Sequence, residues 1–80
     1  MPYLSISGFF PEPNPDDSIK YKKAVPQEAQ ILVLTTMGWA SLTDVPEGEH
    51  ELTEIQAAAV LESLGDPLNN ELVYCVGLRR

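Results

Sequence analysis

The chain has 80 residues, of which 44% are hydrophobic, and a formal net charge of −7. The hydrophobic share excludes an intrinsically disordered chain and predicts a single small folded domain, residues 1–80, despite the acidic balance. The only cysteine, Cys75, excludes an intramolecular disulfide, and one cysteine with one histidine cannot supply the four ligands of a structural zinc site.

The N-terminal quarter of the chain predicts two strands. Residues 3–10 alternate in the manner of a strand, and residues 19–25 predict a second one that ends at Pro26. On the first strand, one face carries Leu4, Ile6, Gly8 and Phe10. Prolines at alternate positions predict an extended connector over residues 11–18, because proline cannot donate to a sheet. The lysines of the second strand suit a sheet edge, which they protect from unwanted pairing.

The middle of the chain predicts a third strand and a loop. Residues 30–42 are rich in aliphatic and β-branched side chains and include Trp39, with Gly38 as a bulge or kink. Pro46 and Gly48 break any regular pattern, so residues 44–51 are expected to form a loop.

A helix and a final strand complete the chain. Thr53 and Gln56 have the spacing of a capping box, and Gly65 is suited to the C-terminal cap. The apolar stripe of this helix consists of Ala57, Val60, Leu61 and Leu64. Residues 71–78 are apolar on both faces, which predicts a strand that is central or covered on both sides.

These elements predict an α+β fold in the order β-β-β-α-β, a three- or four-stranded sheet with one helix packed on one face. The two strands that flank the helix are expected to be parallel neighbours or near neighbours. The second face of the sheet is then solvated or buried by another copy of the chain, because one helix covers one face only.

Catalytic chemistry is not expected. His50, the only histidine, lies between Glu49 and Glu51, and consecutive extended residues point to opposite sides, which disfavours a metal site there. Cys75 has the setting of an unreactive buried thiol. The five glycines are scattered singly and form no phosphate-binding loop. The sequence therefore predicts no enzyme, no cofactor and no metal; a metal- or redox-responsive enzyme would rest on His50 and Cys75 alone.

The distribution of charge is the main functional signal. From residue 24 to residue 78 the chain has nine acidic side chains and neither lysine nor arginine. The candidate partner-binding residues are Asp44, Glu47, Glu49, Glu51 and Glu54, which we call the acidic ridge, together with Trp39. In an extended chain, alternate carboxylates stand roughly 6.5–7 Å apart. This spacing is about twice the distance, along the helix axis, between successive phosphates of one DNA strand. An acidic surface that only keeps a small protein soluble is the plainer interpretation.

Direct binding of nucleic acid is disfavoured. Lys20, Tyr21, Lys22 and Lys23 resemble a nucleic-acid contact, but the net charge repels a polyanion over about 8–10 Å. A membrane partner is disfavoured too, since the longest aliphatic run, residues 31–34, is far short of a spanning helix.

The sequence therefore predicts a non-enzymatic, cytoplasmic, acidic binding protein with a basic protein partner. The most specific version is an inhibitor that occupies a nucleic-acid-binding surface, as in phage anti-defence or toxin–immunity proteins. The alternative is a structural homo-oligomer, at its simplest a homodimer, that packs through an aromatic sheet face of Phe9 or Phe10 and Trp39.

Overall fold

The computed structural model describes residues 2–11 and 19–80, which form an α+β fold with a four-stranded antiparallel sheet and two helices. The predicted connector over residues 11–18 lies, except for Pro11, outside the described residues. The elements in chain order are β1 (Tyr3–Phe9), β2 (Tyr21–Ala24), α1 (Gln27–Met37), a 3-10 turn (Leu42–Asp44), β3 (Glu49–Glu51), α2 (Glu54–Leu64) and β4 (Val73–Arg79).

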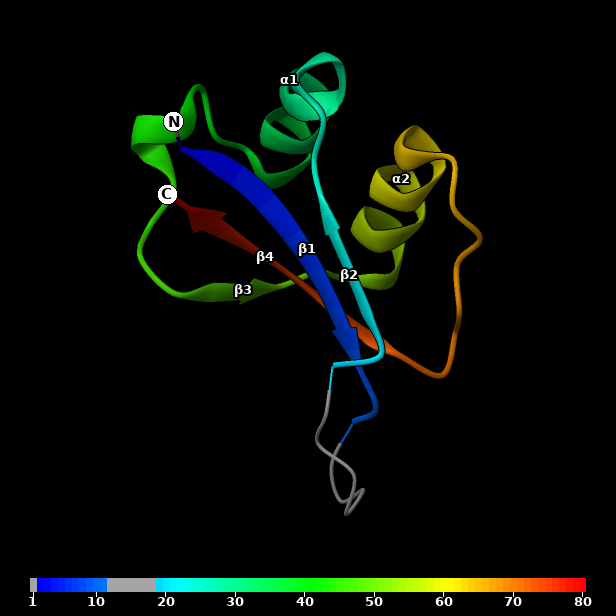
Figure 1. Cartoon of the computed structure of the whole chain (residues 1–80). Coiled ribbons are helices and arrows are strands. Elements are labelled where there is room, and N and C mark those ends of the chain that lie inside the picture. The colour runs from blue at the N-terminus through cyan, green and yellow to red at the C-terminus, as the bar shows by residue number, and fades with distance from the viewer. Residues whose placement is uncertain (1, 12–18) are drawn as a thin grey trace.

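The strands lie in the order β2-β1-β4-β3, and each pair of neighbours is antiparallel (Figure 1). The prediction that the last strand is central is confirmed, because β4 lies between β1 and β3. The prediction that the strands flanking α2 are parallel is wrong. Residues 65–72 carry the chain back along α2, so that β4 starts at the end of the sheet where β3 stops, with Glu51 opposite Cys75.

The predicted third strand is wrong, because most of it is helix α1. Pro26 stands at the N-terminal cap, and Gly38 ends the helix in the left-handed conformation (φ 79°) instead of forming a bulge. Ala29 and Val33 are four residues apart and face the core, whereas Ile31 remains 75% exposed. The run of aliphatic residues from 31 to 34 concealed this helical stripe.

The predicted helix over residues 53–65 is confirmed as α2. The backbone N–H of Gln56 donates to Thr53 Oγ1 (3.1 Å), and the backbone N–H of Thr53 donates to Gln56 Oε1 (2.9 Å). The two hydrogen bonds complete the capping box. Gly65 caps the other end with φ 76°. The local sequence therefore fixes both ends of α2.

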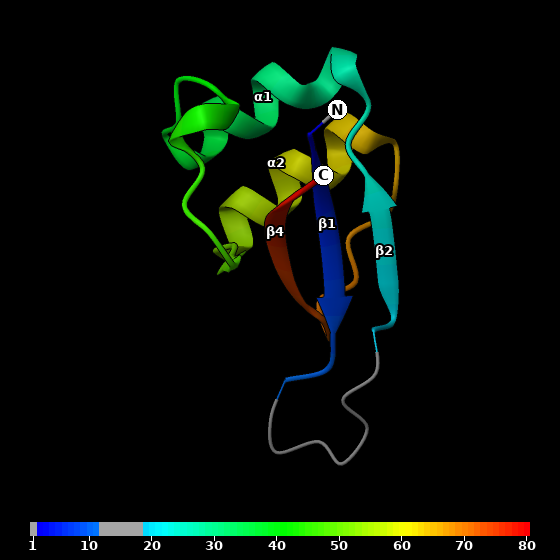
Figure 2. The ribbon, with the colours of Figure 1, turned by 60° about the vertical axis from the view of Figure 1, so that its left-hand side comes forward.

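The core lies between the sheet and both helices, which cover the same face of the sheet (Figures 1 and 2). Its main side chains are Leu4 and Ile6 of β1, Tyr74 and Val76 of β4, Val33 and Leu34 of α1, and Val60 and Leu61 of α2. The predicted faces of β1 are confirmed, but two helices cover the sheet where the sequence predicted one. We call the opposite side of the sheet the outer face; its central residues are Ser5, Ser7, Cys75 and Gly77.

The lysine-rich strand β2 holds the end of α2 in place. Lys23 Nζ donates to the carbonyl oxygen of Leu64, the last residue of α2, and to Asp66 Oδ2, both at 3.1 Å. The Tyr21 hydroxyl donates to the same Asp66 oxygen at 2.7 Å. The hydrogen bond from Tyr21, followed by that from Lys23, lowers the pKa of the Asp66 carboxyl. This network joins the sheet edge to the C-terminal end of α2, where a cation is favourable.

The Asp66→Asn variant should be less stable than the parent at pH 7. Because the pKa of Asp66 is lowered in the folded state, the ionised carboxylate stabilises the fold above its unfolded pKa of about 3.9. This contribution is lost as the pH falls through the lower folded pKa. The difference in urea midpoint between variant and parent should therefore be present at pH 7 and shrink below about pH 4. Glu62→Gln, an exposed acid on α2, is the control; an equal difference at both pH values would contradict the role of the Asp66 charge.

Candidate partner-binding site

The acidic ridge follows the edge of the sheet. Glu49 and Glu51 belong to edge strand β3, so the predicted loop over residues 44–51 is wrong at its last three residues. Asp44 ends the 3-10 turn and Glu54 is the first residue of α2. Because β3 is extended, Glu49 and Glu51 point to the same side, the outer face, as the sequence predicted for alternate carboxylates.

Two members of the ridge have partners inside the protein. Glu49 forms an ion pair with Arg79, which β4 brings alongside β3. A Cβ at Gly77 would collide with the Glu49 carboxylate, so this pair lies flat over the outer face. Asp44 Oδ2 accepts a hydrogen bond from the Ala40 N–H at 3.1 Å. The sequence predicted that no cation would compensate the charge of the ridge. The pairing of β3 with β4 nevertheless places the cation Arg79 beside Glu49.

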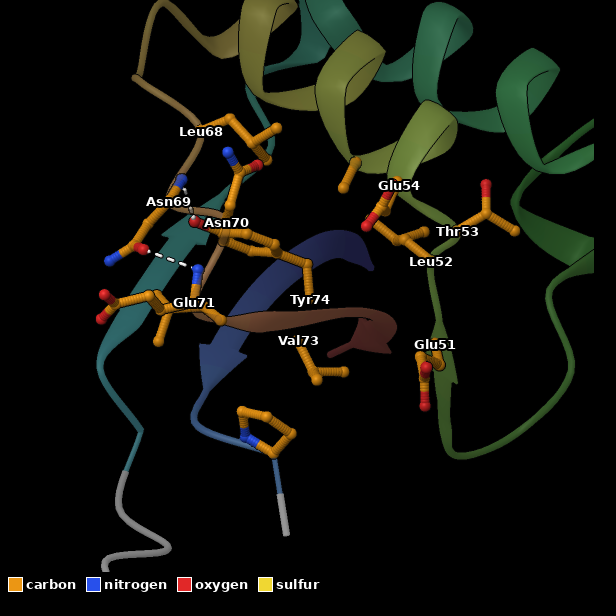
Figure 3. A pocket seen from close by; sticks show the side chains of 13 residues that line it. Glu51, Leu52, Thr53, Glu54, Leu68, Asn69, Asn70, Glu71, Val73 and Tyr74 are labelled. Atoms are coloured by element: carbon orange, nitrogen blue, oxygen red, sulfur yellow. Dashed lines mark hydrogen bonds between the residues drawn. The ribbon is translucent and has the colours of Figure 1, made fainter. Parts of the chain in front are cut away.

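A hollow of about 270 Å³ lies beyond the end of β3 (Figure 3). One wall is the junction of β3 and α2, and the other is the loop that leads into β4. The lining residues are Pro11, residues 51–54, Ala57 and residues 68–74.

Three acidic residues line this hollow, and we call them the acidic pocket: Glu51, Glu54 and Glu71. In Figure 3 the Glu71 carboxylate points away from the hollow. Glu51 and Glu54 come from the β3–α2 junction and Glu71 from the opposite loop (Figure 3). None of the three side chains forms a hydrogen bond or ion pair with the described part of the chain. Glu71 was not among the residues predicted from the sequence, because it is far along the chain from Glu54; its one signal was an acidic side chain without a basic neighbour.

The base of the acidic pocket is apolar and its far wall is ordered by hydrogen bonds. Leu52 and Ala57 are buried beneath it. In the loop, the Asn69 N–H donates to the Tyr74 hydroxyl (3.1 Å), and the Glu71 N–H donates to Asn69 Oδ1 (2.9 Å; Figure 3). These bonds hold the backbone of Glu71 against the start of β4.

Trp39 lies away from the two carboxylates of β3. Its ring packs edge-to-face on His50 (centroids 5.4 Å apart), and both residues lie on the helix side of the sheet. His50 Nε2 is 2.9 Å from the carbonyl oxygen of Pro46. Phe9 shares the outer face with Val73, so Trp39 and Phe9 are on opposite sides of the sheet. Phe9 and Trp39 therefore do not form one aromatic sheet face; the version with Phe10, and the homo-oligomer itself, stay predictions.

Cys75 is buried on the outer face, opposite Ser7, and not in the core between sheet and helices. Burial, and then the charges of Glu49 and Glu51, raise the pKa of the Cys75 thiol. A raised pKa keeps the thiol protonated and poorly nucleophilic. Within residues 2–11 and 19–80, no cluster of three or more His, Cys, Asp or Glu side chains is arranged to hold a metal ion.

Comparisons of the chain with protein-family models, curated proteins and solved structures find no match. Neither helix in the described part of the chain is long and apolar enough to span a bilayer. The observations that bear on function are therefore the geometry and charge of the acidic pocket.

Proposed function

We propose that this protein is a non-enzymatic binding protein whose acidic pocket engages a basic partner protein. The observation that carries the proposal is a 270 Å³ hollow lined by three acidic residues, none of whose side chains is paired within the described part of the chain, in a chain of net charge −7. Carboxylates in this position favour cations and repel nucleic acid and anionic membranes.

The pocket has the chemistry that a lysine or arginine side chain requires. The aliphatic stem of such a side chain packs against apolar surface while its charged head remains at the rim. Leu52, Ala57 and Tyr74 supply the apolar surface here, and Glu51, Glu54 and Glu71 line the same hollow. Arginine gains most from this arrangement, because its guanidinium binds a carboxylate through two parallel hydrogen bonds.

The more specific proposal is inhibition of a nucleic-acid-handling protein by charge mimicry. Glu49 and Glu51 are spaced along an extended edge strand in the manner of alternate phosphates; Glu47 precedes this strand in the chain, and Glu54 follows it in the first turn of α2. A cytoplasmic inhibitor of the kind found in phage anti-defence or toxin–immunity pairs would use such a surface. Arg79 already neutralises Glu49. We therefore expect Glu51 and Glu54 to contribute most of the ridge's binding to the partner.

The test begins with capture of the partner from a lysate at low salt, followed by release in a salt gradient. We expect a basic, nucleic-acid-handling protein that leaves the column at moderate salt, since screening shortens the range of these charges. The affinity of that purified partner is then measured for two double variants. Glu54→Gln with Glu71→Gln should weaken binding about tenfold or more, which corresponds to about 1.4 kcal/mol or more.

The matched control is Glu28→Gln with Glu62→Gln, which removes the same charge away from the pocket. Glu28 lies in the first turn of α1, as Glu54 does in α2, so the helix-dipole effects are similar. The control should bind within about twofold of the parent. Equal losses of affinity in both double variants would mean that binding depends on net charge and not on the acidic pocket. No loss of affinity in either variant would contradict the proposal.

A further inference from the structure

The edge strand β3 has main-chain groups that point away from the sheet. The Leu52 N–H donates to the Tyr74 carbonyl oxygen at 2.8 Å, in the register that pairs β3 with β4. Because the bonding direction alternates along an antiparallel ladder, the N–H and C=O groups of His50 point to β4, and those of Glu49 and Glu51 point outward. β3 is the last strand of the sheet, and both helices lie over one face of the sheet and not beyond this edge (Figures 1 and 2). The outward groups can therefore pair with an added strand.

The two edges of the sheet differ in how they are protected. The opposite edge, β2, carries lysines, a common defence of an edge strand against pairing with another chain. β3 contains neither lysine nor proline, and its outer-face side chains are those of Glu49 and Glu51. Like charges directly opposite each other destabilise a sheet, so the β3 strand of a second copy would be repelled. Charge complementarity therefore favours a basic strand at this edge.

Each side of β3 favours one kind of side chain on the added strand. Glu51 faces the outer side and forms no hydrogen bond or ion pair with the described part of the chain. A residue directly opposite Glu51 would have its Cβ about 4.5–5.5 Å away, so that a lysine or arginine there pairs with the carboxylate. On the helix side, His50 packs on the partly buried ring of Trp39. An apolar residue opposite His50 would pack beside these rings.

The hollow continues the same edge. Pairing with β4 extends one residue past β3, to Leu52, and Leu52 lines the hollow together with Glu51 and Glu54. A strand that lies along β3 and continues past Glu51 therefore passes the hollow. Its next outer-face side chain, about 6.5–7 Å further along, then lies near Glu54. Because Glu49 is already paired with Arg79, the charges that remain for a partner are concentrated at this end of β3.

We propose that β3 binds an extended segment of a basic protein as an additional, antiparallel strand of the sheet. The segment carries lysine or arginine opposite Glu51 and at the hollow, and apolar residues at the positions between, on the side of Trp39. Antiparallel pairing continues the pattern of this sheet and is slightly more stable per residue than parallel pairing. Main-chain hydrogen bonds supply affinity, and the alternating side chains supply specificity. This inference rests on the proposed function and specifies how the acidic edge engages its partner.

The test uses a short synthetic peptide in which lysine and valine alternate, at low salt, with the fluorescence of Trp39, the only tryptophan, as the readout. In the antiparallel register the lysines opposite Glu49 and Glu51 turn their N–H groups to β3, and the valines turn theirs away. A peptide methylated at the lysine backbone nitrogens should therefore bind at least about tenfold more weakly, because it loses these donors. The matched control, methylated at the valine backbone nitrogens, has the same charge and should bind within about twofold of the unmodified peptide.

Amide hydrogen exchange locates the bound peptide. Binding of the unmodified peptide should slow the exchange of the Glu49 and Glu51 amides at least about tenfold, since both become hydrogen-bonded. The His50 amide, which already points to β4, should change much less. Equal affinities of the two methylated peptides, or a loss with the valine-methylated peptide alone, would overturn the inference. Unchanged exchange of the Glu49 and Glu51 amides, or a peptide that does not bind, would also overturn it.

Two further outcomes separate this inference from its alternatives. If the two methylated peptides bind alike but Glu54→Gln with Glu71→Gln weakens the binding of both, the proposed function stands and strand addition fails. In that case the acidic pocket engages basic segments through charge alone. If the Glu49 and Glu51 amides are protected at high protein concentration without peptide, the edge is occupied by a second copy of the chain, and the inference also fails.

Discussion

Replacing Leu61 with alanine is expected to lower the free energy of unfolding by about 2–5 kcal/mol. The Leu61 side chain is 1% exposed and lies at the centre of the core between α2 and the sheet. Its truncation removes buried apolar surface and leaves a cavity that the close-packed surroundings fill only in part. A domain of this size has a total stability on the order of 4–12 kcal/mol. The loss is thus a large fraction of the total and should lower the Tm by roughly 10 °C or more.

Ile55→Ala is the matched control on the same helix. Ile55 is 84% exposed, so its truncation should change the stability by about 0.5 kcal/mol or less. Urea unfolding followed by the fluorescence of Trp39 and by far-ultraviolet circular dichroism measures both variants. Similar losses for Leu61→Ala and Ile55→Ala would mean that α2 does not present the Leu61 face to the core.

Gly8→Ala should destabilise the fold by about 1–3 kcal/mol through overpacking. A Cβ at position 8 would stand 2.9 Å from Tyr74 Cε1 and 3.1 Å from Tyr21 Cβ. These two tyrosines pack edge-to-face above Gly8, with ring centroids 5.7 Å apart, and Tyr74 is 3% exposed. Neither the buried ring nor the Cβ of Tyr21 can move away without disturbing the core. The usual gain from Gly→Ala in the unfolded state, about 0.4–1 kcal/mol, is too small to compensate.

Gly77→Ala provides the comparison on the outer face of β4, the neighbouring strand. There the added methyl group meets the ends of the Glu49 and Arg79 side chains, and both side chains are more than a third exposed. Because flexible side chains can shift, we expect a change in stability below about 1 kcal/mol. Thermal unfolding of the two variants checks the difference, and a larger loss for Gly77→Ala than for Gly8→Ala would contradict the assignment of the two faces.

The sequence predicted the elements whose signals are local. The capping box of Thr53 and Gln56 predicted the start of α2, and the alternation of residues 3–10 predicted the two faces of β1 correctly. Helix α1 was missed because its aliphatic residues are consecutive, so that the stripe of Ala29 and Val33 became visible only once the core was known. Strand β3 was missed because its three residues are all polar and are extended chiefly through pairing with β4.

The candidate site was predicted only in part, for a related reason. Glu51 and Glu54 are near each other in the sequence, so their proximity could be expected. Glu71 reaches the same hollow through the turn after α2, and Arg79 reaches Glu49 through strand pairing. Both placements bring together segments that are distant in the chain, which neither spacing nor composition encodes. Charge counting therefore identified the acidic edge but not which of its carboxylates are already paired.

The pairing of β1 with β4 also determines when this domain can fold. Tyr3 lies opposite Arg79, so the two central strands come from segments separated by nearly the whole described chain. Contacts of such long range are associated with slow folding, on the order of milliseconds to seconds, compared with faster folding for helical proteins with local contacts. During synthesis, β1 keeps one edge unpaired until residues 73–79 have emerged. The sheet is therefore completed only after the last strand has been synthesised.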